Sequence, residues 1–205
     1  MAKTNNRKVA ASRTHNLALL GILTAVVVVL QLLALATRAV FPVFAISLVL
    51  IPITVGAAVI GVRAGAWLGL AFGAAVLISG DAAWFFSINQ GGTVATVLVK
   101  GALAGLAAGG VYKLFAEVIV KNRTVAAIAA GIICPIVNTG VFVIGSYLFF
   151  LPEITEWGAT KGFESGASSI FFGMVGTNFL VELGINMVFI PVIVRLIQHG
   201  NEKRA

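Results

Sequence analysis

The feature that most constrains this chain is a succession of long apolar segments, each almost free of charge. The hydrocarbon core of a bilayer is about 30 Å thick, and an α-helix needs roughly 17–25 residues to cross it. Within a bilayer, a helix satisfies its own backbone hydrogen bonds. The sequence therefore predicts an all-α integral membrane protein: a single domain over residues 1–205, built as a bundle of six transmembrane helices. The predicted helices lie at residues 17–37, 45–62, 65–79, 93–118, 124–150 and 168–197.

Composition supports a membrane environment. Hydrophobic residues make up 60% of the chain and charged residues only 10%, whereas soluble domains contain about 25% charged residues. Such a chain has too few polar side chains to cover a surface that faces water.

Basic residues predict the orientation of the helices, because cytoplasmic loops are enriched in Lys and Arg. If there are six helices, one side of the membrane holds most of them, and the other side holds only Arg38 and Lys161. Both termini are therefore predicted to be cytoplasmic, with tails at residues 1–16 and 198–205. A cleaved signal peptide is disfavoured, because the first apolar segment exceeds the usual 7–15 residues. The basic residues on the predicted cytoplasmic side are Lys3, Arg7, Lys8, Arg13, Arg63, Lys113, Lys121, Arg123, Arg195, Lys203 and Arg204.

Catalytic and metal-binding motifs are missing from the sequence. There is no G-x-x-x-x-G-K-[ST] phosphate loop, no H-E-x-x-H and no G-x-S-x-G. Asp81 is the only aspartate, Cys134 is the only cysteine, and the two histidines, His15 and His199, lie at predicted helix ends. The sequence therefore predicts neither an enzyme nor a resident metal or cofactor.

Small residues recur at every fourth position in three of the segments. Lipid provides no hydrophobic force between helices, so close packing requires small residues at the contact. In the third and fourth segments we expect these residues to pack within the chain. In the first segment they face either another helix of the chain or a partner subunit. The stripes are Gly65, Gly69 and Gly73; Gly101, Gly105 and Gly109; and Gly21 and Ala25.

Polar residues inside the apolar segments predict a binding pocket, because polar groups in hydrocarbon usually face a cavity or a partner. Lys100 either neutralises Glu182 or faces a carboxylate of a substrate. Asn138 follows Pro135, whose missing N–H frees a backbone carbonyl. This Asn138 amide either faces a ligand or bonds a neighbouring helix. The polar residues are Gln31 in the first segment, Thr93, Thr96 and Lys100 in the fourth, Asn138 in the fifth, and Asn178, Glu182 and Asn186 in the sixth.

Two segments on the predicted outer side combine aromatic, acidic and glycine residues. They are residues 80–92, which include Trp84 and Asn89, and residues 151–167, which include Trp157. Trp residues often form a belt at the membrane interface. The alternative is a pair of loops that cover a site opening outward.

The chain resembles the substrate-binding S component of energy-coupling factor (ECF) transporters, which import vitamins. The stretches that carry the resemblance are ISLVLIPITVGAAVIGVRAGAWLGLAFG, VKGALAGLAAGGVYKLF and CPIVNTGVF. The resemblance implies capture of a vitamin at the external face of a prokaryotic plasma membrane. It also implies that Gly21 and Ala25 dock on a membrane coupling (T) subunit, which works with two cytoplasmic ATPases.

The resemblance places the substrate pocket among the fourth to sixth helices and the external loops. Lys100 and the asparagines favour pantothenate over riboflavin or folate, although a flavin ring would suit Trp84. The substrate-binding candidates are Asn138, Lys100, Asn178, Glu182, Thr96, Trp84 and Asn89.

The main alternative is a stand-alone, ion-coupled secondary transporter of a small organic solute, in which Glu182 carries the coupling proton. Such a transporter would take up its solute under an ion gradient, without ATPase partners. A membrane enzyme that uses Lys100 and Glu182, or an assembly subunit without a ligand, has less support from the residues.

Overall fold

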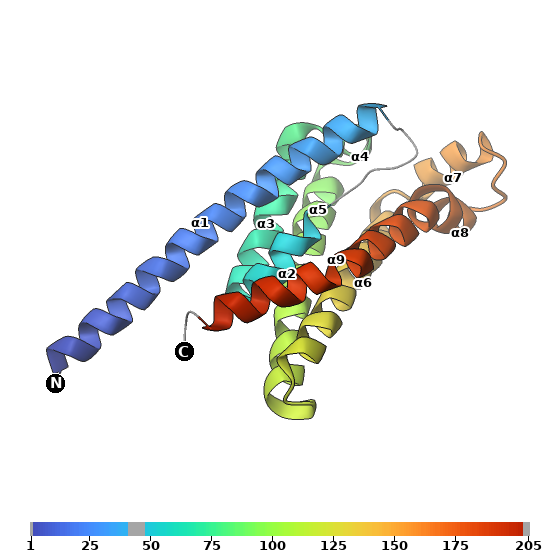
Figure 1. The fold of residues 1–205 in the computed structure, drawn as a ribbon. Coiled ribbons are helices and arrows are strands. Elements are labelled where there is room, and N and C mark those ends of the chain that lie inside the picture. The colour runs from blue at the N-terminus through green and yellow to red at the C-terminus, as the bar shows by residue number, and fades with distance from the viewer. Residues whose placement is uncertain (1, 41–47, 203–205) are drawn as a thin grey trace.

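The computed structural model describes the backbone of residues 2–40 and 48–202, and their side chains except those of residues 2–12, 37–40, 177, 178, 190 and 200–202. In this part of the chain every regular element is a helix, which confirms the all-α prediction (Figure 1). The α-helices are α1 (Ala2–Val40), α2 (Leu50–Val59), α3 (Val62–Ser79), α4 (Ala83–Ile88), α5 (Gln90–Lys113), α6 (Arg123–Phe149), α7 (Leu151–Ala159), α8 (Gly166–Ser168) and α9 (Gly176–Glu202); η1 (Leu114–Ile119) and η2 (Ser169–Val175) are π-helical segments.

Five helices of the described chain are long and apolar enough to cross a membrane. The sequence predicted six, and the second of these, at residues 45–62, is the one whose crossing is not confirmed. Only α2 is described there, and its ten residues span about 15 Å, half of a bilayer core. Gly61, with φ 133°, separates α2 from α3, and residues 41–47 lie outside the described chain. The five spans are Arg13–Ala36, Val62–Ser79, Gln90–Ile119, Arg123–Phe149 and Gly166–Phe189.

The boundaries of the other predicted segments agree well with the helices. The predicted fourth segment corresponds to α5 and η1 together, and the fifth corresponds to α6. The predicted first segment lies inside the longer α1, so residues 2–16, predicted to be a tail, continue this helix. Similarly, α9 continues to Glu202.

The centre of the bundle is the packing of α3 against α5, and glycines make it possible. A Cβ on Gly73 would lie 2.8 Å from the Val97 carbonyl oxygen. A Cβ on Gly69 would overlap the Gly101 carbonyl oxygen, and one on Gly105 would overlap the Gly65 carbonyl oxygen. The two backbones are therefore in direct contact, which confirms the prediction that these stripes pack within the chain.

The two predicted external segments are mostly helical. The first contains α4 and the second contains α7. In Figure 1 both helices lie at the end of the bundle opposite the N terminus and the join between η1 and α6. Ile154 of α7 is fully buried and packs with Phe150 and Ile170 in a second core cluster. These helices form the rim beside which the candidate site lies.

Candidate functional site

Three polar residues share one face of α5, because Thr93, Thr96 and Lys100 are spaced by three and four. The Thr93 hydroxyl donates to the Asn89 carbonyl oxygen at 2.8 Å. Thr96 is only 5% exposed, and its side chain lies against Gly145 of α6. Its Oγ1 has no hydrogen-bond partner among the described residues. Such a buried hydroxyl costs free energy unless another molecule pairs with it.

A second polar face lies on α6, where Asn138, Phe142 and Ser146 follow one another at intervals of four. Asn138 is 6% exposed and Ser146 is fully buried. In the described part of the chain, neither Asn138 Oδ1 nor Ser146 Oγ has a hydrogen-bond partner. Pro135 lies within α6 without ending the helix, and its missing N–H leaves the Gly131 carbonyl without an intrahelical donor.

Two aromatic rings lie near the ammonium group of Lys100. Its Nζ lies 5.6 Å from the ring centre of Phe72 on α3 and 5.3 Å from that of Phe142 on α6. Both distances fall within the range of cation–π attraction. Phe142 also contacts Phe85 edge to face, with ring centres 5.6 Å apart, and Phe85 contacts Trp84 at 4.8 Å. Three aromatic rings, those of Trp84, Phe85 and Phe142, thus run from the external helix α4 to the lysine inside the bundle.

The predicted polar residues of the sixth segment lie on α9, which packs against α6. The Cys134 thiol is fully buried, one turn before Asn138 on α6. The Asn186 amide donates to the Glu182 carbonyl oxygen at 2.8 Å, and the Asn186 Oδ1 has no partner in the described chain. The side chain of Asn178, another predicted binding residue, lies outside the described side chains.

Asn89 has a structural role in this conformation. Its side chain caps α5 by accepting a hydrogen bond from the Gly92 backbone N–H at 2.8 Å. Asparagine is among the preferred residues at such a position. The residue marks the external start of α5, one turn before Thr93.

Two side-chain contacts fasten α1 to the rest of the bundle. Gln31, only 2% exposed, donates to the Asp81 carboxylate at 3.1 Å. Asp81 precedes α4, so this bond joins α1 to the external rim. Further along α1, the Thr24 hydroxyl accepts a hydrogen bond from the Trp67 indole at 3.3 Å.

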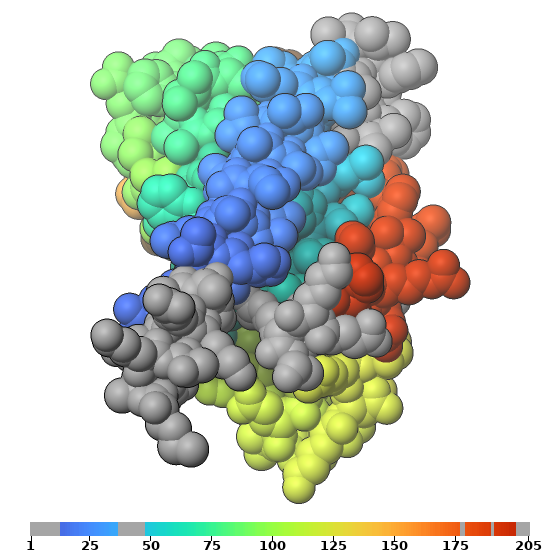
Figure 2. All heavy atoms as spheres, turned by 60° about the vertical axis from the view of Figure 1, so that its left-hand side comes forward, coloured from blue at the N-terminus to red at the C-terminus, as the bar shows by residue number. Residues whose placement is uncertain are grey.

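The small residues of α1 lie on a face that the described part of the chain leaves uncovered. Gly21 and Ala25 are both exposed, and a Cβ on Gly21 would have no other atom within 4 Å. Figure 2 shows α1 lying along the outside of the bundle. This small-residue stripe therefore does not pack within the described chain, unlike those of α3 and α5.

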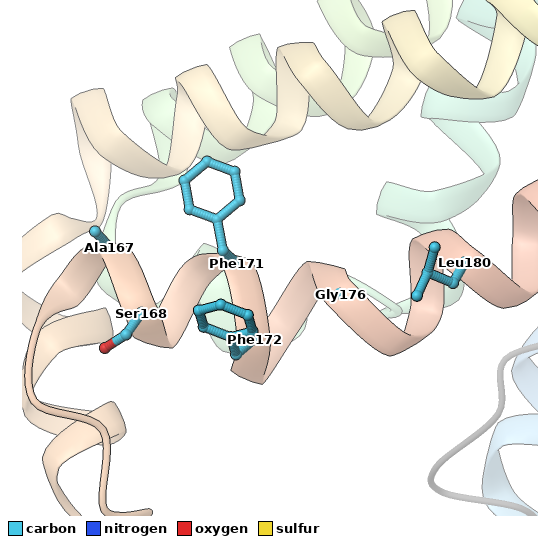
Figure 3. A pocket seen from close by; sticks show the side chains of 6 residues that line it. All are labelled: Ala167, Ser168, Phe171, Phe172, Gly176 and Leu180. Carbon is cyan, nitrogen blue, oxygen red and sulfur yellow. The ribbon is translucent and has the colours of Figure 1, made fainter.

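The open groove on η2 and the start of α9 is apolar and separate from these polar faces (Figure 3). Its volume is about 570 Å³, and among the described side chains none of the predicted binding residues lines it. In a span predicted to cross the membrane, exposed apolar side chains suit lipid tails. The lining residues are Ala167, Ser168, Phe171, Phe172, Gly176 and Leu180.

The structure places Lys100 beside the ring of Phe142, which also contacts Phe85. Asn138 lies one turn before Phe142 on α6, and Thr96 lies one turn before Lys100 on α5. Sequence reasoning missed Phe142, Phe72 and Ser146. A detectable signal existed for two of them, because the four-residue spacing from Asn138 places Phe142 and Ser146 on the same helix face. Phe72 had no comparable signal, since one phenylalanine in an apolar helix looks like any core residue.

Comparison with known proteins identifies the family. The family described as "ECF transporter, substrate-specific component" matches residues 15–194, which is most of the chain. Searches of curated proteins and of solved structures gave no match. The family match covers four of the five candidate membrane spans completely. It also covers the span in α1, except for the first two residues of that span. The chain is a multi-pass membrane protein and belongs to the family of substrate-specific components of ECF transporters.

Proposed function

We propose that this chain captures a water-soluble vitamin or a similar micronutrient at the external face of a prokaryotic plasma membrane and delivers it to an ATP-driven importer. Its family consists of transporter subunits, not enzymes. The observation that carries the proposal is the pair of buried oxygens on Thr96 and Asn138 that have no partner in the described chain. They lie on two helices that pack together, α5 and α6, and Lys100 is one turn from Thr96. Buried polar groups are almost always hydrogen-bonded, so an absent ligand is a physical explanation for both.

The candidate residues take complementary roles in this proposal. Lys100 attracts an acidic group of the ligand, and charge-assisted hydrogen bonds are among the stronger ones. Asn138 Oδ1 accepts a hydrogen bond from the ligand, and Thr96 Oγ1 donates or accepts one. Asn178 and Glu182 of α9, together with Trp84 and Asn89 at the external end of the bundle, complete the proposed set.

The delivery step requires partners. The chain has no phosphate loop, so the energy comes from elsewhere: a membrane coupling (T) subunit and two cytoplasmic ATPases. Gly21 and Ala25 on the uncovered face of α1 form the proposed docking surface, because small residues allow close approach of helices in lipid.

Reconstitution tests this function against the ion-coupled alternative. Liposomes that contain the chain and an ECF module are expected to take up the substrate only with ATP. Liposomes that contain the chain alone are expected to bind it without accumulating it. Accumulation by the chain alone under a proton or sodium gradient would contradict the proposal.

Asn138→Ala is expected to weaken ligand binding without unfolding the protein. A net hydrogen bond contributes about 0.5–1.5 kcal/mol, which corresponds to roughly two- to tenfold in affinity. Calorimetric titration of purified protein with its vitamin measures the change. Ile136→Ala is the control, because Ile136 lies on the same helix but is 42% exposed. Equal affinities for the two variants would place the pocket elsewhere.

A further inference from the structure

One polar side chain of α1 turns into the bundle. Gln31 lies within the membrane span Arg13–Ala36 and shares the buried face of α1 with Val27 and Ala34, at spacings of four and three. Its side-chain amide donates to the Asp81 carboxylate. Polar groups are rare at membrane depth, and a hydrogen bond to a charged acceptor is stronger than one between neutral groups. This contact is therefore specific, unlike the apolar packing around it.

Asp81 lies in the short connection that leads into α4. Gly80, just before it, ends α3 in the left-handed conformation, with φ 77°, which glycine adopts readily. Helix α4 begins two residues later, at Ala83. The bond from Gln31 thus attaches the start of α4 to α1, at a residue 50 positions away in the sequence.

Helix α4 depends on contacts outside itself. It has six residues, none of them buried, and so short a helix is not stable alone. At its far end, Asn89 leaves the helix in an extended conformation. Within α4, the Phe85 ring contacts the bundle at Phe142 and Phe150, with ring centres 5.6 and 5.1 Å apart. A segment with so few buried side chains opens at a low free energy, so each attachment matters.

The contact made by Phe85 connects α4 with the candidate site. Phe142 lies one turn after Asn138 on α6, and the Nζ of Lys100 is 5.3 Å from the centre of the Phe142 ring. A shift of α4 would withdraw Phe85 from Phe142 and loosen the packing beside Lys100. The position of α4 therefore bears on the site.

We infer that Gln31 is a positioning residue: by holding Asp81, it fixes the start of α4 from α1 and keeps Phe85 against Phe142. Its role is to place α4, not to touch the substrate. The inference goes beyond vitamin capture, because it names the contact that orders one part of the external end of the bundle. It rests on the proposed function only in taking Lys100 as part of the site.

Hydrogen exchange of the purified full chain tests the inference without any substrate. The reporters are the backbone N–H groups of Phe86 and Asn89, whose hydrogen bonds to the preceding turn form only while α4 is folded. Gln31→Leu is expected to speed their exchange by about tenfold or more, because a hydrogen bond to a charged group is lost. The backbone N–H groups of α5 serve as the internal reference and are expected to keep their rates.

A matched variant of α1 controls for general loosening of this helix. Thr24→Val removes the hydrogen bond that the Trp67 indole donates to Thr24. Because Trp67 lies on α3 rather than beside α4, exchange in α4 is expected to stay unchanged. Thermal unfolding of each variant confirms that the bundle is intact.

Variants of Asp81 show whether the two residues act through one bond. Asp81→Asn keeps an acceptor but loses the charge, so its exchange in α4 is expected to be intermediate. In a double-mutant cycle, Gln31→Leu combined with Asp81→Ala is expected to exchange no faster than Asp81→Ala alone. Additive effects of the two substitutions would show that Gln31 acts on α4 by another route and would overturn the inference.

Labelling of Lys100 with a water-soluble, amine-reactive reagent tests the link to the site. Mass spectrometry is expected to show faster modification of Lys100 in Gln31→Leu but not in Thr24→Val. Equal exchange in α4 for these two variants would overturn the inference, as would faster exchange with unchanged labelling of Lys100. These measurements involve no vitamin, so their outcome is separate from that of the proposed function. Ion-driven uptake by the chain alone would remove the capture role and leave the attachment of α4 intact.

Discussion

Gly21→Leu is expected to abolish ATP-driven uptake while leaving ligand binding unchanged. Gly21 is exposed on α1, and a Cβ there would have no atom within 4 Å, so the chain folds normally around the larger side chain. A leucine at this position would hold a partner helix several ångströms away and disrupt the close contact that small residues permit. Uptake into liposomes with a complete ECF module measures transport, and ligand titration of the isolated chain measures binding. Ala25→Leu, one turn along the same exposed face, is expected to behave alike.

The control for this experiment is Gly110→Leu. Gly110 is also an exposed helical glycine with no atom near its added Cβ, but it lies on α5, away from the proposed docking face. This variant is expected to transport normally. Normal uptake by Gly21→Leu would refute the docking assignment, and loss of ligand binding would show that α1 also shapes the pocket.

Gly69→Leu is expected to cause the largest loss of stability of any single substitution considered for this chain. A Cβ on Gly69 would overlap the Gly101 carbonyl oxygen, which belongs to the backbone of α5. Backbone atoms cannot turn aside as a flexible side chain can, so α3 and α5 must separate. Overpacking of this kind costs about 1–3 kcal/mol or more, and 3 kcal/mol corresponds to roughly 6–12 °C in Tm for a chain of this size.

Thermal unfolding in detergent measures this effect, and Gly110→Leu is again the matched control. Its open surroundings predict a Tm close to that of the unsubstituted chain. If the two glycine variants unfolded at the same temperature, the close contact between α3 and α5 would be in doubt.

Much of the fold was predictable because membrane-spanning helices carry their signal in length and apolarity. The predicted segments at residues 93–118 and 124–150 match α5 with η1 and α6 within a few residues. The sequence did not reveal that α2 begins only at Leu50, because the apolar run that starts at residue 45 carries no signal of a helix start there. It also did not predict the helices in the external segments. Short helices such as α4, with six residues, depend on tertiary contacts more than on local propensity.

The site was predictable only in its polar part. Lys100, Thr96 and Asn138 stand out because polar groups are rare at membrane depth, and the structure places them on facing helices. The aromatic part was not predictable, since Phe72 and Phe142 differ from the other phenylalanines only by their distance from Lys100. Such a distance depends on how α3, α5 and α6 pack, and no spacing along one helix contains it.

The most direct test of vitamin capture is to purify the chain gently from the membranes of cells grown in rich medium, denature it and identify the released small molecules by mass spectrometry. The account predicts one water-soluble micronutrient in a near-stoichiometric amount. If the protein is empty, the same compounds are tested by thermal stabilisation, where a ligand at a hundred times its Kd adds about 2.7 kcal/mol. A protein that releases no micronutrient and that no vitamin stabilises would contradict the account.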